Sequence, residues 1–188
     1  AAMLNQVIKL TYSTTATLAI ADVQIIGPGA SFLTIDGNSR GTVFRATGGN
    51  SLLSHLTVTG GTNSGIIVSG GADLVLDNMV VTGNRSSLYG GGVFNNNGLL
   101  TVANSTVSRN SASDGGGVYS TGLSSDTSVL NSTVLGNSAS YGGGICGVGA
   151  VTVSNSIVSG NTASLLGGGI FGSSTLHVAN STIAGNSA

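Results

Sequence analysis

The stretch Asn-Ser-Thr-Val at residues 104–107, followed by Gly-Gly-Gly-Val at residues 115–118, decides the fold because it is repeated. The Asn stretch returns at residues 131–134, 155–158 and 180–183, and the glycine run returns at residues 142–144 and 167–169. From Asn78 on, the first Asn of each copy recurs after 26, 27, 24 and 25 residues. A period of this length is typical of a solenoid, in which each repeat forms one coil and packs on the next.

Within each repeat, short alternating segments separated by turns predict β-strands. In one repeat these segments are residues 99–102, 106–108 and 117–119. Helical periodicity is absent, and the glycine content would penalise a helix. The chain is therefore predicted to be all-β: a single-stranded parallel β-helix, or β-solenoid, of about seven coils of roughly 22–27 residues, with three short strands per coil. We expect one domain over residues 1–188, with degenerate coils in 1–50 and regular repeats in 51–188.

One aliphatic residue of each strand aligns from repeat to repeat, which predicts columns of inward side chains spaced about 4.8 Å apart. The first column is Val58, Val81, Val107, Val134, Val158 and Ile183. The second is Ile66, Val93, Val118, Ile145 and Ile170. The third strand carries two columns: Leu74, Leu100, Thr127, Val151 and Leu176, joined by Leu76, Val102, Val129, Val153 and Val178.

Asparagines recur at two places in each repeat. We expect both sets to form ladders in the turns, where each amide bonds to the equivalent amide of the next coil. The first set opens the motif: Asn78, Asn104, Asn131, Asn155 and Asn180. The second set lies six residues further on.

The segments at residues 26–30 and 33–38, with the repeated Asn-Ser-Thr-Val and Gly-Gly-Gly blocks, resemble the right-handed parallel β-helix repeat proteins of bacteria. The chain is similar to the repeats of polymorphic outer-membrane proteins and adhesin passengers over nearly its whole length. The resemblance implies a right-handed coil, in agreement with the bias of parallel crossovers, and a secreted or surface location. Its motifs are specific for the fold and not for an activity.

In the strand that follows each glycine run, the residue next to the inward one also aligns from repeat to repeat. If that inward column is correct, its neighbours point to solvent, one per coil, and form a candidate interface stripe: Ile67, Phe94, Tyr119, Cys146 and Phe171. An exposed apolar stripe usually marks an interface, and aromatic rings also suit sugars. The alternative is simple stacking of like residues along a sheet, which needs no partner.

Composition excludes several classes of function. The 188 residues have a net charge of -1, which leaves no electrostatic footprint for nucleic acid. No apolar run approaches the roughly 20 residues of a membrane span. Charged residues make up 6% of the chain, so repulsion between copies is weak and self-association is favoured.

Catalysis is the least supported class. The acidic residues are six scattered aspartates, and His55 and His177 lie far apart along the predicted rod, so we expect no catalytic pair, no metal and no cofactor. Threonines at residues 57–59 and 106–108 resemble the Thr-x-Thr rows of ice-binding solenoids. Other side chains interrupt those rows at the equivalent positions Val80, Leu135, Ile157 and Ala184.

These observations predict a non-catalytic structural protein, extracellular or at the cell surface. No capping element is visible in the sequence at either end of the predicted coil stack, which favours head-to-tail stacking of copies into a filament or surface layer. The alternative is an adhesin-type or passenger-type module that binds glycans or a surface along one face.

Overall fold

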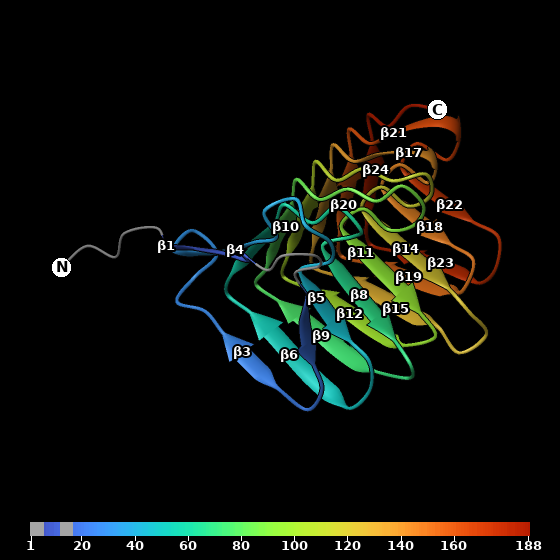
Figure 1. Ribbon diagram of the computed structural model, residues 1–188. Helices are drawn as coiled ribbons and strands as arrows, with labels where there is room; N and C mark the ends of the chain where they lie inside the picture. The colour runs from blue at the N-terminus through green and yellow to red at the C-terminus, as the bar shows by residue number, and fades with distance from the viewer. Residues whose placement is uncertain (1–5, 12–16) are drawn as a thin grey trace.

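The computed structural model describes residues 6–11 and 17–188, and these form strands and turns without a helix. The strands stack from the N-terminal end to the C-terminal end in three parallel sheets, as Figure 1 shows. Strands that lie three apart along the chain pair through most of each sheet, because each coil contributes one strand to every sheet. The predicted all-β parallel β-helix of about seven coils is confirmed.

The first sheet has eight strands and the second and third have seven each. The first sheet contains β1 (Gln6–Lys9), β4 (Leu33–Asp36), β7 (Thr57–Thr59), β10 (Val80–Thr82), β13 (Thr106–Ser108), β16 (Thr133–Leu135), β20 (Ile157–Ser159) and β24 (Thr182–Ala184). The second contains β2 (Leu18–Ile20), β5 (Phe44–Ala46), β8 (Ile66–Ser69), β11 (Val93–Asn96), β14 (Val118–Thr121), β18 (Ile145–Gly147) and β22 (Ile170–Gly172). The third contains β3 (Gln24–Ile26), β6 (Asn50–Ser54), β9 (Asp73–Asp77), β12 (Leu99–Ala103), β15 (Asp126–Leu130), β19 (Ala150–Ser154) and β23 (Leu176–Ala179). A fourth sheet pairs only β17 (Ser138–Tyr141) with β21 (Thr162–Leu166).

The core lies inside the coils and consists of the predicted aliphatic columns. In the first sheet, Val81 pairs with Val107 and Val107 with Val134, and all three side chains are fully buried. The columns of the second and third sheets keep the predicted register as well. Only the members in the final coil are exposed, among them Val178 and Ile183. Aliphatic side chains are therefore buried continuously along the axis. Each Å² of apolar surface removed from water stabilises the fold by about 25 cal/mol.

In the turn between the third and first sheets, the structure contradicts half of the asparagine prediction, because the first asparagine set does not form a ladder. The side chains of Asn78, Asn104, Asn131, Asn155 and Asn180 are exposed, and their φ angles lie between 49° and 53°. Asn tolerates this left-handed conformation better than most residues, because its short amide can bond locally. Asn78 and Asn104 both donate to the carboxylate of Asp77, and no bond between successive amides of this set occurs among the described residues. This set therefore shapes the turn and does not form a ladder.

The serine that follows each of these asparagines forms a ladder that the sequence reasoning missed. The backbone N–H of Ser105 donates to Ser132 Oγ at 3.1 Å, and that of Ser132 donates to Ser156 Oγ at 3.0 Å. Ser105, Ser132 and Ser156 are buried, at 2–4% exposure. Because a residue in the left-handed conformation turns the chain sharply, the next side chain points into the coil. The Asn-Ser pair recurs at the same place in each repeat, and this regularity could have predicted the serine ladder.

The second asparagine set forms the predicted ladder: Asn84, Asn110, Asn137, Asn161 and Asn186. At each step, both the backbone N–H and the side-chain Nδ2 donate to Oδ1 of the next Asn, at 2.9–3.1 Å. The same Nδ2 also donates to a strand carbonyl, as Asn137 does to Val107 at 3.0 Å. Asn137 is 1% exposed. Buried amides are stable here because the ladder satisfies their hydrogen-bonding groups.

Candidate functional site

The outward column of the second sheet has the predicted register. Arg45 pairs with Ile67, and the column continues through Phe94, Tyr119, Cys146 and Phe171. The prediction that these five stripe residues point freely into solvent is wrong. Ile67, Tyr119 and Cys146 are 5%, 7% and 2% exposed, and Phe94 and Phe171 are half-buried.

The stripe is buried because the connections between the first and second sheets fold back over it. We call residues 85–90, 111–115, 138–142 and 162–167 the covering loops; β17 and β21 lie within the last two. Each loop ends in a glycine at positive φ: Gly90, Gly115, Gly142 or Gly167. A Cβ added at Gly115 would lie 2.8 Å from Cβ of Tyr119. Glycine thus permits both the turn and the close approach to the stripe.

The covering loops bring a second set of side chains onto the stripe. Tyr89, Asp114, Tyr141 and Leu166 are aligned from loop to loop by parallel pairing. The ring of Tyr89 stacks on that of Tyr119, with centroids 4.8 Å apart and 12° between the planes, and meets Phe94 at 5.7 Å. Tyr141 meets Phe171 at 5.7 Å. The result is a layer of aromatic rings in which sheet residues and loop residues pack together.

The thiol of Cys146 lies in this layer and is predicted to be unreactive. Burial raises its pKa to about 12, and the nearby charge of Asp114 acts in the same direction. At pH 8 about one thiol in ten thousand is then ionised, and only the thiolate attacks alkylating reagents. We expect iodoacetamide to modify the native protein at least about 100-fold more slowly than the urea-denatured protein. Mass spectrometry over time measures this, and equal rates would show that the covering loops open freely.

The carboxyl of Asp114 is expected to make the stability of the folded protein depend on pH. Burial raises the pKa of this carboxyl above the ordinary value of 3.8, although a hydrogen bond with Ser113 opposes the shift. The folded state then keeps this proton at pH values where the unfolded state has released it, so the ionised carboxylate lowers stability at neutral pH. Asp114→Asn is expected to raise the melting temperature by about 1–2 °C at pH 7, since the group is only half-buried.

The gain from Asp114→Asn should shrink as the pH falls through the raised pKa and should vanish below 3.8, where both states bind the proton. Thermal unfolding of both proteins, followed by circular dichroism between pH 3 and 8, measures the difference. A gain that stays constant over this range would mean that the charge of Asp114 is not the cause.

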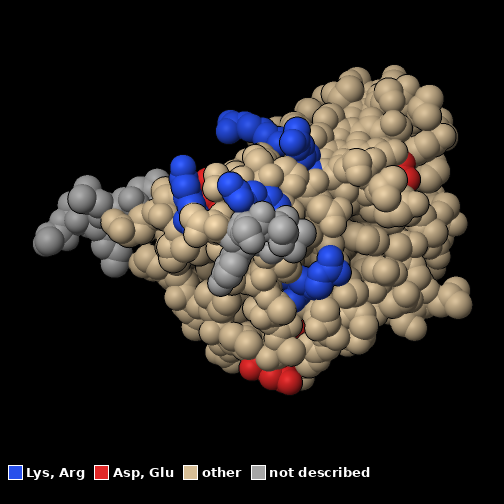
Figure 2. Space-filling view, in the orientation of Figure 1, with Lys and Arg blue, Asp and Glu red and all other residues tan. Residues whose placement is uncertain are grey.

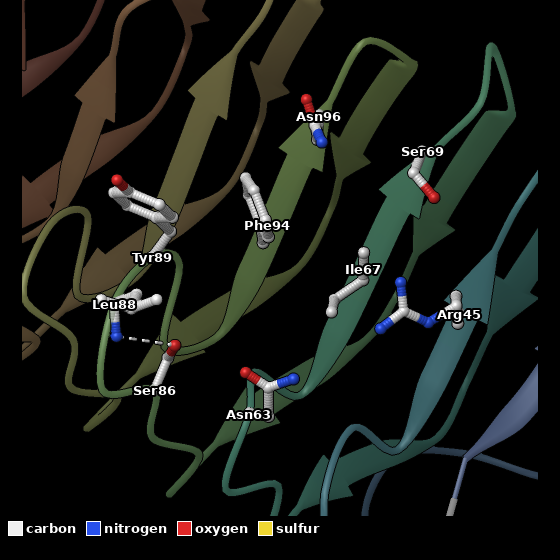
Figure 3. Close-up of a pocket in the computed structure, with 9 residues that line it drawn as sticks. All are labelled: Arg45, Asn63, Ile67, Ser69, Ser86, Leu88, Tyr89, Phe94 and Asn96. Atoms are coloured by element: carbon white, nitrogen blue, oxygen red, sulfur yellow. Dashed lines mark hydrogen bonds between the residues drawn. The ribbon is translucent and has the colours of Figure 1, made fainter.

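A hollow of about 180 Å³ opens where the first covering loop begins. In the preceding coil the connection between β7 and β8, residues 60–65, is shorter than the connection between β10 and β11, residues 83–92. The hollow is lined by Arg45, Asn63, Ile67, Ser69, Ser86, Leu88, Tyr89, Phe94 and Asn96. Figure 3 shows Tyr89 and Arg45 at opposite ends, with Phe94 and Ile67 between them on β11 and β8. The sequence reasoning found Ile67 and Phe94 of this group and missed the rest.

Basic side chains gather on the same side of the molecule. Figure 2 shows Lys and Arg over the N-terminal half of the face that it views, while the C-terminal half in that view carries none. The sequence explains the contrast, because residues 127–188 contain no Lys, Arg, Asp or Glu. A second hollow, lined by Thr62, Arg85, Ser86, Ser87 and Ser111, adjoins the first through Ser86. Positive charge therefore borders the hollow, although the chain as a whole is close to neutral.

No aspartate is among the residues that line this hollow, although Asp114 pairs with Tyr89 from the next coil. Several other aspartates hold turns. Asp22 accepts a hydrogen bond from the backbone N–H of Asn50, and Asp36 accepts one from that of Asn38. Asp73 and Asp77 occupy the two ends of β9. Across residues 6–11 and 17–188, no group of three His, Cys, Asp or Glu side chains is placed to hold a metal ion. In the same residues no helix has the length and hydropathy to cross a bilayer.

The chain was compared with known proteins. A family model described as a right handed beta helix region matches residues 23–188. Searches of curated proteins and of solved structures gave no match. The matched range includes every coil that contributes to the hollow and to the covering loops.

Proposed function

This chain belongs to the right-handed β-helix family, and we propose that it serves as a non-catalytic glycan-binding module of the cell surface or the extracellular space. Of the two functions that the sequence suggested, the geometry gives more support to the binding module. The observation that carries the proposal is the hollow beside Tyr89, since it is the place where aromatic, apolar and polar side chains converge on one open surface.

The side chains of the hollow suit a sugar. Tyr89 is 39% exposed, and because Tyr119 covers one face of its ring, the hollow is bordered by a ring that is already held in place. Sugar rings pack their C–H faces on such aromatic platforms. The amides of Asn63 and Asn96 offer both donors and acceptors to hydroxyl groups. A pre-ordered ring loses little conformational entropy on binding, which favours affinity.

The arrangement of acids supports a function without catalysis. Glycoside cleavage commonly uses two carboxylates that flank the scissile bond. None of the residues lining the hollow is an aspartate. Asp22, Asp36 and Asp77 accept hydrogen bonds that shape turns. The oxygens of these carboxylates are used in the fold, which is a structural role.

A glycan array probed with the purified chain tests the proposal. We expect the wild-type protein to bind a subset of immobilised glycans, and Tyr89→Ala to weaken that binding about 10-fold, because the stacking ring is lost. Tyr141→Ala is the matched control: it removes a ring from the same loop column, outside the hollow. Binding by the control should stay within about 2-fold of wild type. A wild-type protein that retains no glycan would refute the proposal.

End-to-end assembly into a filament is a second candidate, favoured by the polarity of the asparagine ladder. Each coil donates from N–H and Nδ2 on one side and accepts at Oδ1 on the other, as Asn110 and Asn137 do. The ladder begins at Asn84, which accepts from the backbone N–H of Gly61. A contact between copies would therefore rest on the same one-directional pairing of parallel strands, a heterologous contact that need not close. Electron microscopy over a concentration series should then show uniform fibres with a layer line at about 4.8 Å. Short separate rods at every concentration would rule the filament out.

A further inference from the structure

We infer that the glycan recognised by the hollow carries an anionic substituent, a carboxylate or a sulfate, which pairs with Arg45. The inference rests on the proposed binding function and adds the chemical class of the ligand. It is carried by the position of Arg45, by the hydrogen-bonding groups left over around it and by the distribution of charge on this side of the molecule.

Arg45 lies in the wall of the hollow, and among residues 6–11 and 17–188 its guanidinium has no hydrogen-bond or ion-pair partner. It is half-buried on β5, in register with Ile67, and lines the hollow together with Tyr89 and Asn63. Within the described part of the chain, no carboxylate forms an ion pair with it. A half-buried guanidinium is partly shielded from water, so an anion that reaches it gains more than at a fully exposed Arg. The planar fork also matches the two oxygens of a carboxylate or sulfate.

Two other polar groups of the hollow present donors, whereas the hydroxyl of Ser69 donates to the carbonyl of Ala46 at 3.3 Å and leaves an acceptor. The oxygen of Asn96 already accepts from Asn97 Nδ2 at 3.1 Å, which leaves its NH₂ available. Ser86 Oγ accepts from the N–H of Leu88, a bond drawn in Figure 3, and keeps its own O–H as a donor. With these two donors, the guanidinium of Arg45 and no carboxylate in its lining, the hollow favours a ligand that is rich in acceptors. An anionic sugar meets this description better than a neutral one.

The spacing of the coils would place the ring of Tyr89 and the guanidinium of Arg45 against different sugar units of one glycan. Phe94, Ile67 and Arg45 belong to successive coils, so the aromatic end and the cationic end are about 10 Å apart at the strand spacing. The hollow, at about 180 Å³, is smaller than the roughly 300–1,000 Å³ pockets that enclose drug-sized ligands. It suits one sugar ring against Tyr89, with the rest of an extended chain crossing the surface towards Arg45. Arg85, which borders the adjoining hollow, extends the positive surface on this side.

Three dextrans of equal length separate the possibilities: unmodified dextran, carboxymethyl-dextran and dextran sulfate. These share a backbone and differ in the presence and the kind of the charged substituent, so binding at fixed ionic strength isolates the anionic group. We expect at least one charged form to bind 10-fold or more tightly than the neutral form. The charged form that binds better identifies carboxylate or sulfate as the substituent.

The Arg45→Gln variant tests whether the tighter binding of a charged dextran depends on Arg45. It should reduce binding of the preferred charged dextran by about 10- to 100-fold and leave binding of glycans from the array that lack charge nearly unchanged. Arg109→Gln is the control, because it removes the same charge from an exposed turn residue that does not line the hollow. Melting temperatures of both variants, compared with wild type, show whether folding is preserved.

The outcomes distinguish this inference from the proposed function. If neutral and charged dextrans bind equally while array glycans are still retained, the ligand class is wrong and the binding module stands. If Arg45→Gln and Arg109→Gln weaken binding equally, the attraction is a diffuse surface effect and the inference is overturned. If the wild-type protein binds no glycan on the array and none of the dextrans, the proposed function fails with it.

Discussion

Replacing Gly117 by alanine is expected to lower the free energy of unfolding by about 3 kcal/mol or more. Gly117 lies in the middle of the stack, where its added Cβ would be 2.5 Å from the carbonyl oxygen of Gly144 and 3.0 Å from Nδ2 of Asn137. The first of these is backbone and cannot rotate away. The coils would have to separate locally, which also disturbs the asparagine ladder. Urea unfolding followed by circular dichroism measures the loss.

Gly136→Ala is the control that separates steric crowding from backbone strain. Gly136 has φ of 62°, and a Cβ added there meets no atom within 4 Å. Alanine at this position therefore carries only the cost of the left-handed conformation, about 1–2 kcal/mol. A Gly117→Ala protein as stable as the Gly136→Ala protein would show that the coils are more widely spaced than the structure indicates.

Asn137→Ala is expected to have a similar or larger effect, a loss of about 3–5 kcal/mol. The substitution removes the acceptor of both the N–H and the Nδ2 of Asn110. It also removes the Nδ2 donor to the backbone carbonyl of Val107 and to Oδ1 of Asn161. These groups lie inside the stack, where water does not replace the lost partners, so each one left unpaired costs about 1–3 kcal/mol.

The turn asparagine of the same repeat provides the comparison. Asn131 is exposed with φ of 49°, and Asn131→Gly keeps that conformation accessible. It should change the free energy of unfolding by less than about 1 kcal/mol. Equal losses for Asn137→Ala and Asn131→Gly, measured by urea unfolding, would contradict the assignment of the ladder to the second asparagine set.

The strands and the core were predictable from the sequence because two signals coincide. Aliphatic residues such as Val81, Val107 and Val134 recur with the coil period, and at least one neighbour of each within its strand is polar. In a solenoid, the same side chain in each coil meets its own copies above and below. A one-dimensional repeat therefore determines the register of three sheets without any knowledge of long-range contacts.

The same periodicity could not distinguish the two asparagine sets. Asn131 and Asn137 both recur once per coil, and the period does not reveal which of them points inward. Backbone conformation decides the matter: Asn131 lies in the left-handed region, whereas Asn137 follows a left-handed glycine, Gly136, and turns into the stack. The serine ladder was missed for a related reason, since Ser132 is small, polar and unremarkable in a turn until its burial is known.

The candidate site was predictable only in part because loops do not follow the repeat. The alignment of Phe94 with Tyr119 could be derived from the sequence, but the path of the chain over them could not. Every stripe residue except Ile67 has a glycine four residues before it, as Gly115 stands before Tyr119, and this was the available signal of a close approach. The connection between β7 and β8, residues 60–65, is shorter than that between β10 and β11, residues 83–92, and this difference marks where the hollow opens.

The hydrogen-bonded ladders also bear on how such a chain can change through evolution. Each rung made by Asn110, Asn137 and Asn161 is equivalent to its neighbours, so duplication or deletion of a whole coil would leave every remaining bond with a partner. Insertion of a single residue inside a strand would shift the register and leave some of these bonds without a partner. The connections that pass outside the ladders are free of this constraint. Natural variants should therefore differ in length by complete repeats, while the segment between Asn84 and Phe94 varies more freely in sequence.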